Sequence, residues 1–144
     1  MEKRMNLFTV EPGIYNIMMS LEKYIAGTTL TATHKELIKI RASQINGCAY
    51  CLDMHTKDAR KYGETEQRIY ALNAWRETTF FTKEEQAILA LTEEVTLITG
   101  HVSDAVYANA VNLLGEKYTA QVILAIIAIN GWNRIAISTK LMPV

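Results

Sequence analysis

The sequence predicts an all-α fold built as a single domain. Its 144 residues match the size of one ordinary domain, and 49% of them are hydrophobic. Apolar residues recur at helical spacing along most of the chain, and no stretch shows the alternation of a half-buried strand. Two prolines and seven glycines are too few for a small all-β domain, which needs many tight turns. We therefore expect a helical bundle of about seven helices over residues 1–144.

The first three predicted helices cover residues 12–27, 31–47 and 48–63. The first follows a Pro-Gly pair and carries its apolar residues on one stripe. Each of the three ends at a glycine, a residue that commonly stops a helix. The third also has a cationic last turn at Lys61, which favours a helix end at this point.

Four more helices are predicted in the second half of the chain, over residues 64–76, 82–100, 103–115 and from 119 into the 130s. Thr82 and Glu85 have the spacing of a capping box, which marks a helix start. Ser103 is a typical N-cap residue for the next helix. The last helix is apolar on most sides, so we expect it at the centre of the bundle.

Charge and hydropathy bear on location and partners. Fifteen Lys and Arg balance fifteen Asp and Glu, so charge favours neither nucleic acid nor an anionic membrane as a partner. Residues 14–26 include charged side chains and do not resemble a signal peptide. The longest uncharged run, residues 118–133, is short and contains four polar residues, which favours a core helix over a membrane span. We expect a cytoplasmic protein.

Both cysteines of the chain fall in one motif, Cys48-Ala49-Tyr50-Cys51, and His55 follows four residues later. At about 100° per residue on a helix, Cys48, Cys51 and His55 share an arc of roughly 60°. The first turn of a helix favours a thiolate, because its backbone N–H groups and dipole are positive. A nearby imidazole can take or return the proton. The pattern predicts a redox-active or nucleophilic dithiol.

Two other interpretations of these residues stay open. The cysteines can be small buried apolar side chains, or they can bind zinc together with His55 and a carboxylate. The chain has no second C-x-x-C and no H-x-x-x-H, which disfavours a closed zinc site. A structural disulfide is not expected in a cytosolic chain. We expect no metal and no flavin, haem or nicotinamide cofactor, because G-x-G-x-x-G and C-x-x-C-H are both absent.

The stretch from Glu36 through Ser43-Gln44-Ile45-Asn46-Gly47 and Cys48-Ala49-Tyr50-Cys51 to His55 resembles the core of the AhpD-like alkylhydroperoxidases, in the carboxymuconolactone decarboxylase superfamily. The similarity covers roughly residues 18–97. It implies an all-helical enzyme, forming trimers or hexamers, that reduces organic hydroperoxides. In that family a cysteine sulfenic acid forms first and an intramolecular disulfide follows. An external dithiol or disulfide reductase then restores the thiols. The decarboxylase branch lacks this dithiol, so its reaction is not expected.

The resemblance assigns roles to four positions. The family's catalytic glutamate corresponds to Glu36, its paired cysteines to Cys48 and Cys51, and its histidine to His55. The best-known members carry a histidine beside the second cysteine, where this chain has a tyrosine. Glu36 also forms a T-x-x-E pattern with Thr33, so a helix-capping role for Glu36 stays open.

Helix position and resemblance disagree on which cysteine attacks. Cys48, at the helix start, is expected to be more exposed and nearer the dipole. The resemblance assigns attack to the second cysteine, Cys51, which lies one helical turn before His55. We predict that Cys51 attacks the hydroperoxide and that Cys48 resolves the sulfenic acid. A protein disulfide oxidoreductase or redox sensor with the same dithiol, and a zinc-binding oligomeric protein, are the alternative hypotheses.

Other residues that could carry chemistry have simpler interpretations. His34 is expected to be a cap or surface residue, and His101 a loop residue. Trp75 and Trp132 are expected to anchor packing. The charged run 57–61 is expected to be a solvated face. Helices 64–76 and 119 onwards carry few polar residues, so we also expect a homo-oligomer that covers their apolar surface.

Overall fold

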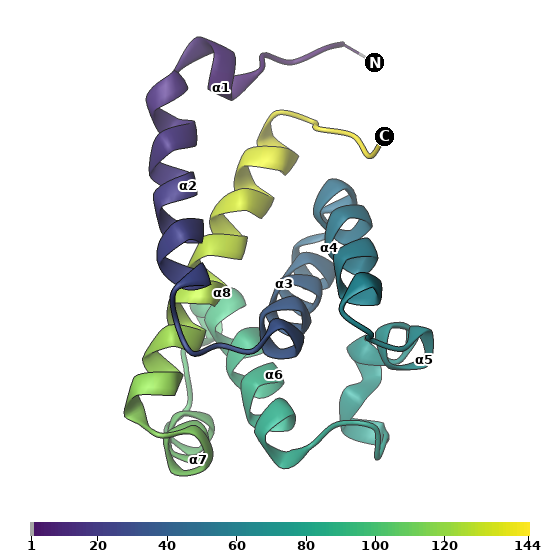
Figure 1. Cartoon of the computed structure of the whole chain (residues 1–144), viewed down its shortest axis with the longest axis vertical. Coiled ribbons are helices and arrows are strands. Elements are labelled where there is room, and N and C mark those ends of the chain that lie inside the picture. Colours follow the sequence, from purple (N-terminus) through teal and green to yellow (C-terminus); the bar gives the residue numbers. More distant parts are fainter. Residues whose placement is uncertain (1) are drawn as a thin grey trace.

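Helices form the whole regular structure of residues 2–144, the range that the computed structural model describes (Figure 1). Residue 1, part of the predicted domain, lies outside this range. The elements in chain order are α1 (Leu7–Val10), α2 (Pro12–Ala26), α3 (Ala32–Asn46), α4 (Ala49–Lys61), α5 (Glu66–Tyr70), the 3₁₀ helix η1 (Leu72–Glu77), α6 (Lys83–Thr96), the 3₁₀ helix η2 (Ile98–Gly100), α7 (Asp104–Leu114) and α8 (Glu116–Ser138). The predicted all-α, single-domain helical bundle is confirmed.

Capping residues mark the helix starts where the sequence predicted them. The Thr82 hydroxyl accepts a hydrogen bond from the Glu85 backbone, and the Glu85 carboxylate accepts one from the Thr82 backbone, at the start of α6. The Ser103 hydroxyl accepts the Val106 N–H at the start of α7. These side chains satisfy backbone donors that have no partner inside the helix.

Four details of the prediction are wrong. The expected helix 64–76 is split into α5 and η1, because the chain tightens after residue 71 and buries Leu72 and Trp75 together. The expected helix 82–100 ends at Thr96 and continues as η2. The last helix starts at Glu116, directly after the left-handed Gly115, rather than at 119. The four-residue α1 was not predicted at all, because one turn is too short for an apolar period.

Helix α8 lies at the centre of the bundle, as predicted. It packs against α2, α3, α6, α7 and α4, and Figure 1 shows α2 running alongside it. Among the helices of residues 2–144, it is the one long and apolar enough to cross a membrane by length and composition. Val122, Ala125, Ile126, Ala128 and Ile129 of α8 are buried in the largest apolar cluster of the described residues. Its neighbours on several sides make it the core helix of the bundle.

Helix α3 is held by apolar clusters on two of its faces. Ile38 and Ala42 face a cluster shared with α2, α6 and α8. Leu37 and Ile40 face a second cluster, shared with α4, α5, η1 and α6. Burying one side chain of this size contributes about 1.5–3 kcal/mol. Because α3 is packed from both sides, its polar side chains have fixed positions.

Arg68 ties α5 to the start of α6. Its guanidinium donates hydrogen bonds to Glu85, to Glu64 and to the Phe80 carbonyl, and it lies 4.7 Å from the centre of the Phe81 ring. Burial raises the pKa of the Glu85 carboxyl, but hydrogen bonds from Arg68 and Thr82 outweigh it. The pKa of Glu85 is therefore lowered from its ordinary value.

We expect the substitution Glu85→Gln to lower stability at neutral pH and to weaken the dependence of stability on acid. A carboxyl whose pKa is lowered on folding stabilises the fold above its unfolded-state pKa, and this contribution is lost as the pH falls through the folded-state pKa. Urea midpoints followed by circular dichroism at about pH 7 and about pH 4 measure the effect. Glu84→Gln, an exposed neighbour in the same helical turn, is the control. Equal acid sensitivity of Glu85→Gln and the parent would contradict the prediction.

Candidate functional site

The turn between α3 and α4 places both cysteines at the start of α4. Gly47 ends α3 with φ 69°, in the left-handed region that glycine adopts without strain. Cys48 is the N-cap of α4, and its backbone N–H donates to the Ser43 carbonyl at 3.0 Å. The Cα atoms of Cys48 and Cys51 are 5.3 Å apart, and their sulfur atoms form a disulfide.

Helix α8 fixes this turn through two asparagine side chains. The Asn133 amide is fully buried and donates to the Ser43 hydroxyl at 3.0 Å. The Asn46 amide donates to the side-chain oxygens of Asn130 and Asn133, each at 2.9 Å. Buried polar groups linked in this way fix one arrangement of the helices around them. The position of Cys48 is therefore set by α8 as well as by its own turn.

The disulfide itself is buried. Cys48 is 1% exposed and Cys51 is 4% exposed, and both pack with Tyr50 and with Ala136 of α8. The expectation that Cys48 is the more exposed cysteine is therefore wrong. Its sulfur turns back over the helix start and accepts the Cys51 N–H at 3.3 Å, while α8 covers the pair. A backbone N–H directed at Cys48 Sγ favours negative charge on that sulfur in the reduced protein.

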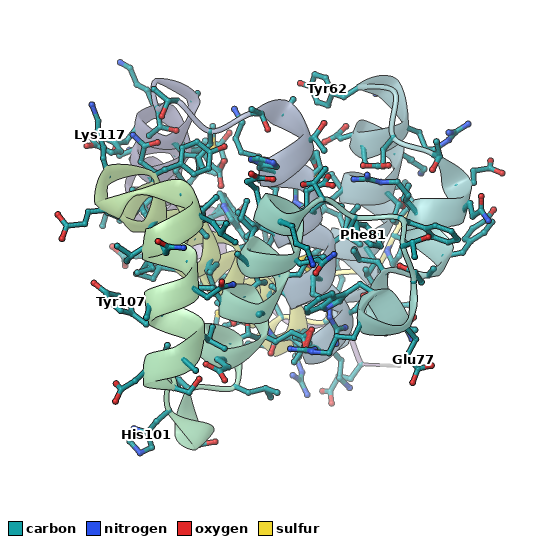
Figure 2. The ribbon with its side chains drawn as sticks, turned by 90° about the horizontal axis from the view of Figure 1, so that it is seen from below. Tyr62, Glu77, Phe81, His101, Tyr107 and Lys117 are labelled. Carbon is teal, nitrogen blue, oxygen red and sulfur yellow. A yellow bond between two sulfur atoms is a disulfide. The ribbon has the colours of Figure 1, made fainter. Side chains whose placement is uncertain are left out.

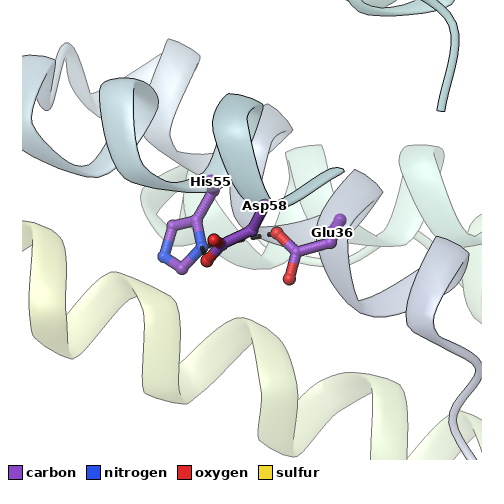
Figure 3. Close-up of side chains that lie close together, drawn as sticks. All are labelled: Glu36, His55 and Asp58. Atoms are coloured by element: carbon purple, nitrogen blue, oxygen red, sulfur yellow. Dashed lines mark ion pairs between the residues drawn. The ribbon is translucent and has the colours of Figure 1, made fainter. Parts of the chain in front are cut away.

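Glu36 of α3 and His55 of α4 meet across the interface of their helices, with Asp58 beside them (Figure 3). Glu36 Oε2 lies 3.4 Å from His55 Nδ1, and Asp58 Oδ2 lies 3.9 Å from the same nitrogen. The Glu36 side chain is 8% exposed and that of His55 is 12% exposed. Within residues 2–144, neither Glu36 Oε2 nor His55 Nδ1 makes a hydrogen bond. These two atoms therefore face each other, and neither is engaged in a hydrogen bond with another group of the described residues.

Glu36 does not cap its helix. The N-cap of α3 is Thr31, whose hydroxyl accepts the His34 N–H at 3.1 Å. The capping interpretation of Glu36 with Thr33 is therefore wrong, and the Glu36 carboxylate is directed at α4. Because the helix begins two residues earlier than the T-x-x-E pattern requires, Glu36 falls in the second turn rather than the first.

The two other histidines lie apart from the dithiol. His34 is half-buried rather than a surface residue or a cap, and its Nδ1 lies 2.6 Å from the Tyr118 hydroxyl. Burial lowers the pKa of His34, against the opposing effect of Glu85 and Glu84. His101 is exposed in the loop after η2, as predicted, and Figure 2 shows it at an outer tip of the molecule. Trp75 and Trp132 each donate to a glutamate, at Glu93 and Glu22.

Two charged neighbours of the site were missed in the sequence. Asp58 was assigned to a solvated run, although its spacing of three residues from His55 places both on one helix face. Lys39 lies three residues after Glu36, and its ammonium is 3.8 Å from Glu36 Oε1. In each case the two residues lie three positions apart on one helix. That spacing indicates a contact in the site only after Glu36 or His55 has been identified as a site residue.

The acidic groups around His55 also bear on metal binding. Glu36, His55 and Asp58 each offer a ligand atom, and these atoms lie within 4.8 Å of one another. The Lys39 ammonium lies next to Glu36, and its positive charge disfavours binding of a metal cation by these three side chains. In the zinc hypothesis, Cys48 and Cys51 are ligands only as thiolates, and hence only in the reduced protein.

Comparison with known proteins places this geometry in a family. The model of the carboxymuconolactone decarboxylase family matches residues 12–94. The uncharacterised protein YdfG of Bacillus subtilis (strain 168) is 48% identical over 139 residues, which cover 96% of this chain and 95% of YdfG.

Solved structures share the fold. ATU0492 from Agrobacterium tumefaciens, a protein of unknown function provisionally assigned as the antioxidant defence protein AhpD, superposes with a TM-score of 0.94 at 36% identity, covering 99% of both chains. The debrominase Bmp8 has the same fold, with a TM-score of 0.85 at 17% identity over 95% of this chain and 74% of that chain. Since the family match spans more than half of the chain and includes all four predicted site positions, the chain belongs to the carboxymuconolactone decarboxylase family, as an AhpD-like member.

Proposed function

We propose that this protein is a peroxidase that reduces organic hydroperoxides with Cys48 and Cys51, and that His55 and Glu36 relay the protons. The observation that carries the proposal is the buried Cys48–Cys51 pair at the start of α4, on the helix whose His55 faces Glu36 at 3.4 Å. Both cysteines are at most 4% exposed. Such burial favours a small hydroperoxide as the oxidant. A protein reductase that resets the disulfide reaches it only when the helices around the pair separate.

The first half of the cycle produces an alcohol. His55 takes the proton of the Cys51 thiol, and the ionised Glu36 stabilises the resulting imidazolium. The Cys51 thiolate then attacks the O–O bond of the hydroperoxide and receives its hydroxyl group, which gives a sulfenic acid. The released alkoxide takes the proton from His55 and leaves as the alcohol.

The second half of the cycle restores the thiols. The Cys48 thiol attacks the sulfenic sulfur of Cys51, which releases water and forms the disulfide. An external dithiol, or a disulfide reductase, then reduces this bond by thiol–disulfide exchange and is itself oxidised. We propose the cytoplasm as its location, because reduced dithiols are maintained there.

Counting free thiols tests the proposal directly. Fully reduced protein is titrated for thiols before and after addition of one equivalent of cumene hydroperoxide. We expect two thiols per chain to fall to none, with formation of a reducible Cys48–Cys51 disulfide. Two persisting thiols would contradict peroxidase function and would leave exchange with a protein thiol or zinc binding, the latter to be tested by elemental analysis of protein purified without chelator.

We also propose that a second copy of the chain covers an apolar groove between α6, α7 and α8, giving a trimer or hexamer. The groove has a volume of about 620 Å³ and is lined mainly by aliphatic side chains, with Asn130 and Arg134 at its polar side. Ile98, Tyr107 and Ile127 in this groove are each more than half exposed, and Figure 2 shows Tyr107 projecting outwards from α7. Apolar surface of this kind marks interaction sites.

The substitution Ile127→Glu is expected to convert the oligomer into a monomer, because it places a charge among the apolar side chains that line the covered groove. Light scattering at micromolar concentration measures the mass of both proteins. Tyr62→Glu, at a position 67% exposed in the turn after α4, is the control and should keep the oligomer. A parent protein that is already monomeric would overturn this part of the proposal.

A further inference from the structure

A line of charged side chains continues from the Glu36–His55 pair to α2. The Lys39 ammonium lies 3.8 Å from Glu36 Oε1 and 3.8 Å from Glu22 Oε2, so it stands between two carboxylates. The second oxygen of Glu22 accepts a hydrogen bond from the Trp132 indole N–H at 2.9 Å. The line therefore joins side chains of α2, α3, α4 and α8.

These groups are far less exposed than charged side chains usually are. The Lys39 side chain is 16% exposed and that of Glu22 is 25% exposed. A carboxylate as buried as Glu36 needs a compensating charge or hydrogen bonds. Within residues 2–144, Lys39 is the one lysine or arginine whose side chain lies within 4.0 Å of the Glu36 carboxylate. A lysine side chain is long enough to reach water, so its position between two carboxylates has a specific cause.

We propose that Lys39 is a positioning residue that keeps Glu36 charged and directed at His55, and that Glu22, held by Trp132, keeps Lys39 in place. The inference rests on the proton relay of the proposed function. Two carboxylates and one ammonium carry one net negative charge, which a protonated His55 cancels. The group is thus prepared to receive one proton at His55.

The other charged groups around His55 do not replace Lys39. On α4, Asp58 lies 3.9 Å from His55 Nδ1, but its side chain is 39% exposed and it pairs with Lys61 at 3.9 Å. Helix α2 contributes Glu22, and α3 contributes Glu36 and Lys39. Trp132, from α8, is neutral. Lys39 is therefore the buried positive charge of this group.

The titration of His55 by NMR tests the proposal in the oxidised protein. The sequence contains three histidines, so the imidazole C–H resonances are few, and the His55 signal is identified by its loss in His55→Gln. Without Lys39, the buried Glu36 carboxylate loses its compensating charge and takes up a proton, so it no longer stabilises the His55 imidazolium. We therefore expect Lys39→Met to lower the pH midpoint of the His55 signal by about one unit, or about tenfold in proton affinity. Lys39→Arg should restore the parent midpoint.

Two comparisons separate this role from a general effect of charge or folding. Lys57→Met removes an exposed lysine from the same helix as His55, where it pairs with Asp53 at 2.8 Å, and should leave the midpoint unchanged. In a Glu36→Gln background, Lys39→Met should move the midpoint by less than about half as much, because Lys39 acts through Glu36. If Lys39→Met does not fold, Lys39→Gln replaces it.

A midpoint that rises, or that stays within about 0.2 units of the parent value, would overturn the proposal, given the shift of about one unit that a close charge produces. A shift of equal size in the Glu36→Gln background would also overturn it, because Lys39 would then act on His55 independently of Glu36. The measurement needs no peroxide. An unchanged midpoint together with normal thiol loss would therefore reject the role of Lys39 and leave the peroxidase proposal standing. A shifted midpoint together with thiols that persist after hydroperoxide is added would support the link from Lys39 to His55 and reject the peroxidase proposal.

Discussion

Cys51→Ser is expected to abolish hydroperoxide reduction, with a fall in turnover of more than about a thousandfold, as is typical when a nucleophile is removed. A serine hydroxyl is not ionised at neutral pH and cannot form the sulfenic acid on which the cycle depends. Consumption of cumene hydroperoxide with dithiothreitol as the reductant measures the loss.

Cys48→Ser is the matched control for the first half of the cycle. It should consume one equivalent of hydroperoxide and leave a Cys51 sulfenic acid that dimedone traps, without forming the intrachain disulfide. The opposite result, in which Cys51→Ser reacts once and Cys48→Ser does not, would exchange the two roles. In that case the Cys51 N–H, which donates to Cys48 Sγ at 3.3 Å, would stabilise the attacking Cys48 thiolate.

His55→Gln is expected to slow the oxidation of the dithiol by about a hundredfold or more, within the range of general acid–base catalysis. The loss arises because the thiol loses its base and the alkoxide loses its acid. Stopped-flow mixing of reduced protein with hydroperoxide measures the rate. Glu36→Gln should slow it less, by about tenfold, because Glu36 acts through the His55 ring that it faces at 3.4 Å.

The double variant distinguishes a relay from two separate effects. If Glu36 acts through His55, then Glu36→Gln combined with His55→Gln should be no slower than His55→Gln alone. Rate losses that multiply would contradict the relay. His101→Gln, in an exposed loop, should react like the parent protein.

The helical part of the site could be predicted because its residues share one helix. The spacing of Cys48, Cys51 and His55 places them on one arc of α4, whatever surrounds that helix. Most helix boundaries followed from local signals such as the Thr82–Glu85 capping box and the terminal glycines, which act within a single turn.

The rest of the site depends on contacts between helices. Glu36 was assigned through resemblance alone, since its local pattern also suited a cap, and the cap proved to be Thr31. The burial of Cys48 depends on Ala136 of α8, more than eighty residues away in the chain. The positions of Lys39 and Asp58 around the Glu36–His55 pair follow from the packing of α3 on α4. No spacing along the sequence contains that information.

The disulfide closes a very short loop, with a sequence separation of three. In the chain-entropy model, a loop of this length restricts the unfolded chain so little that it stabilises the fold by about 2 kcal/mol, against about 4.7 kcal/mol for a loop of a hundred residues. The apolar clusters on either side of α3 hold the bundle together without it. Opening the bond therefore costs about 2 kcal/mol out of the roughly 5–15 kcal/mol that stabilises a typical domain. The reduced bundle can stay folded, so that the redox cycle is separated from unfolding.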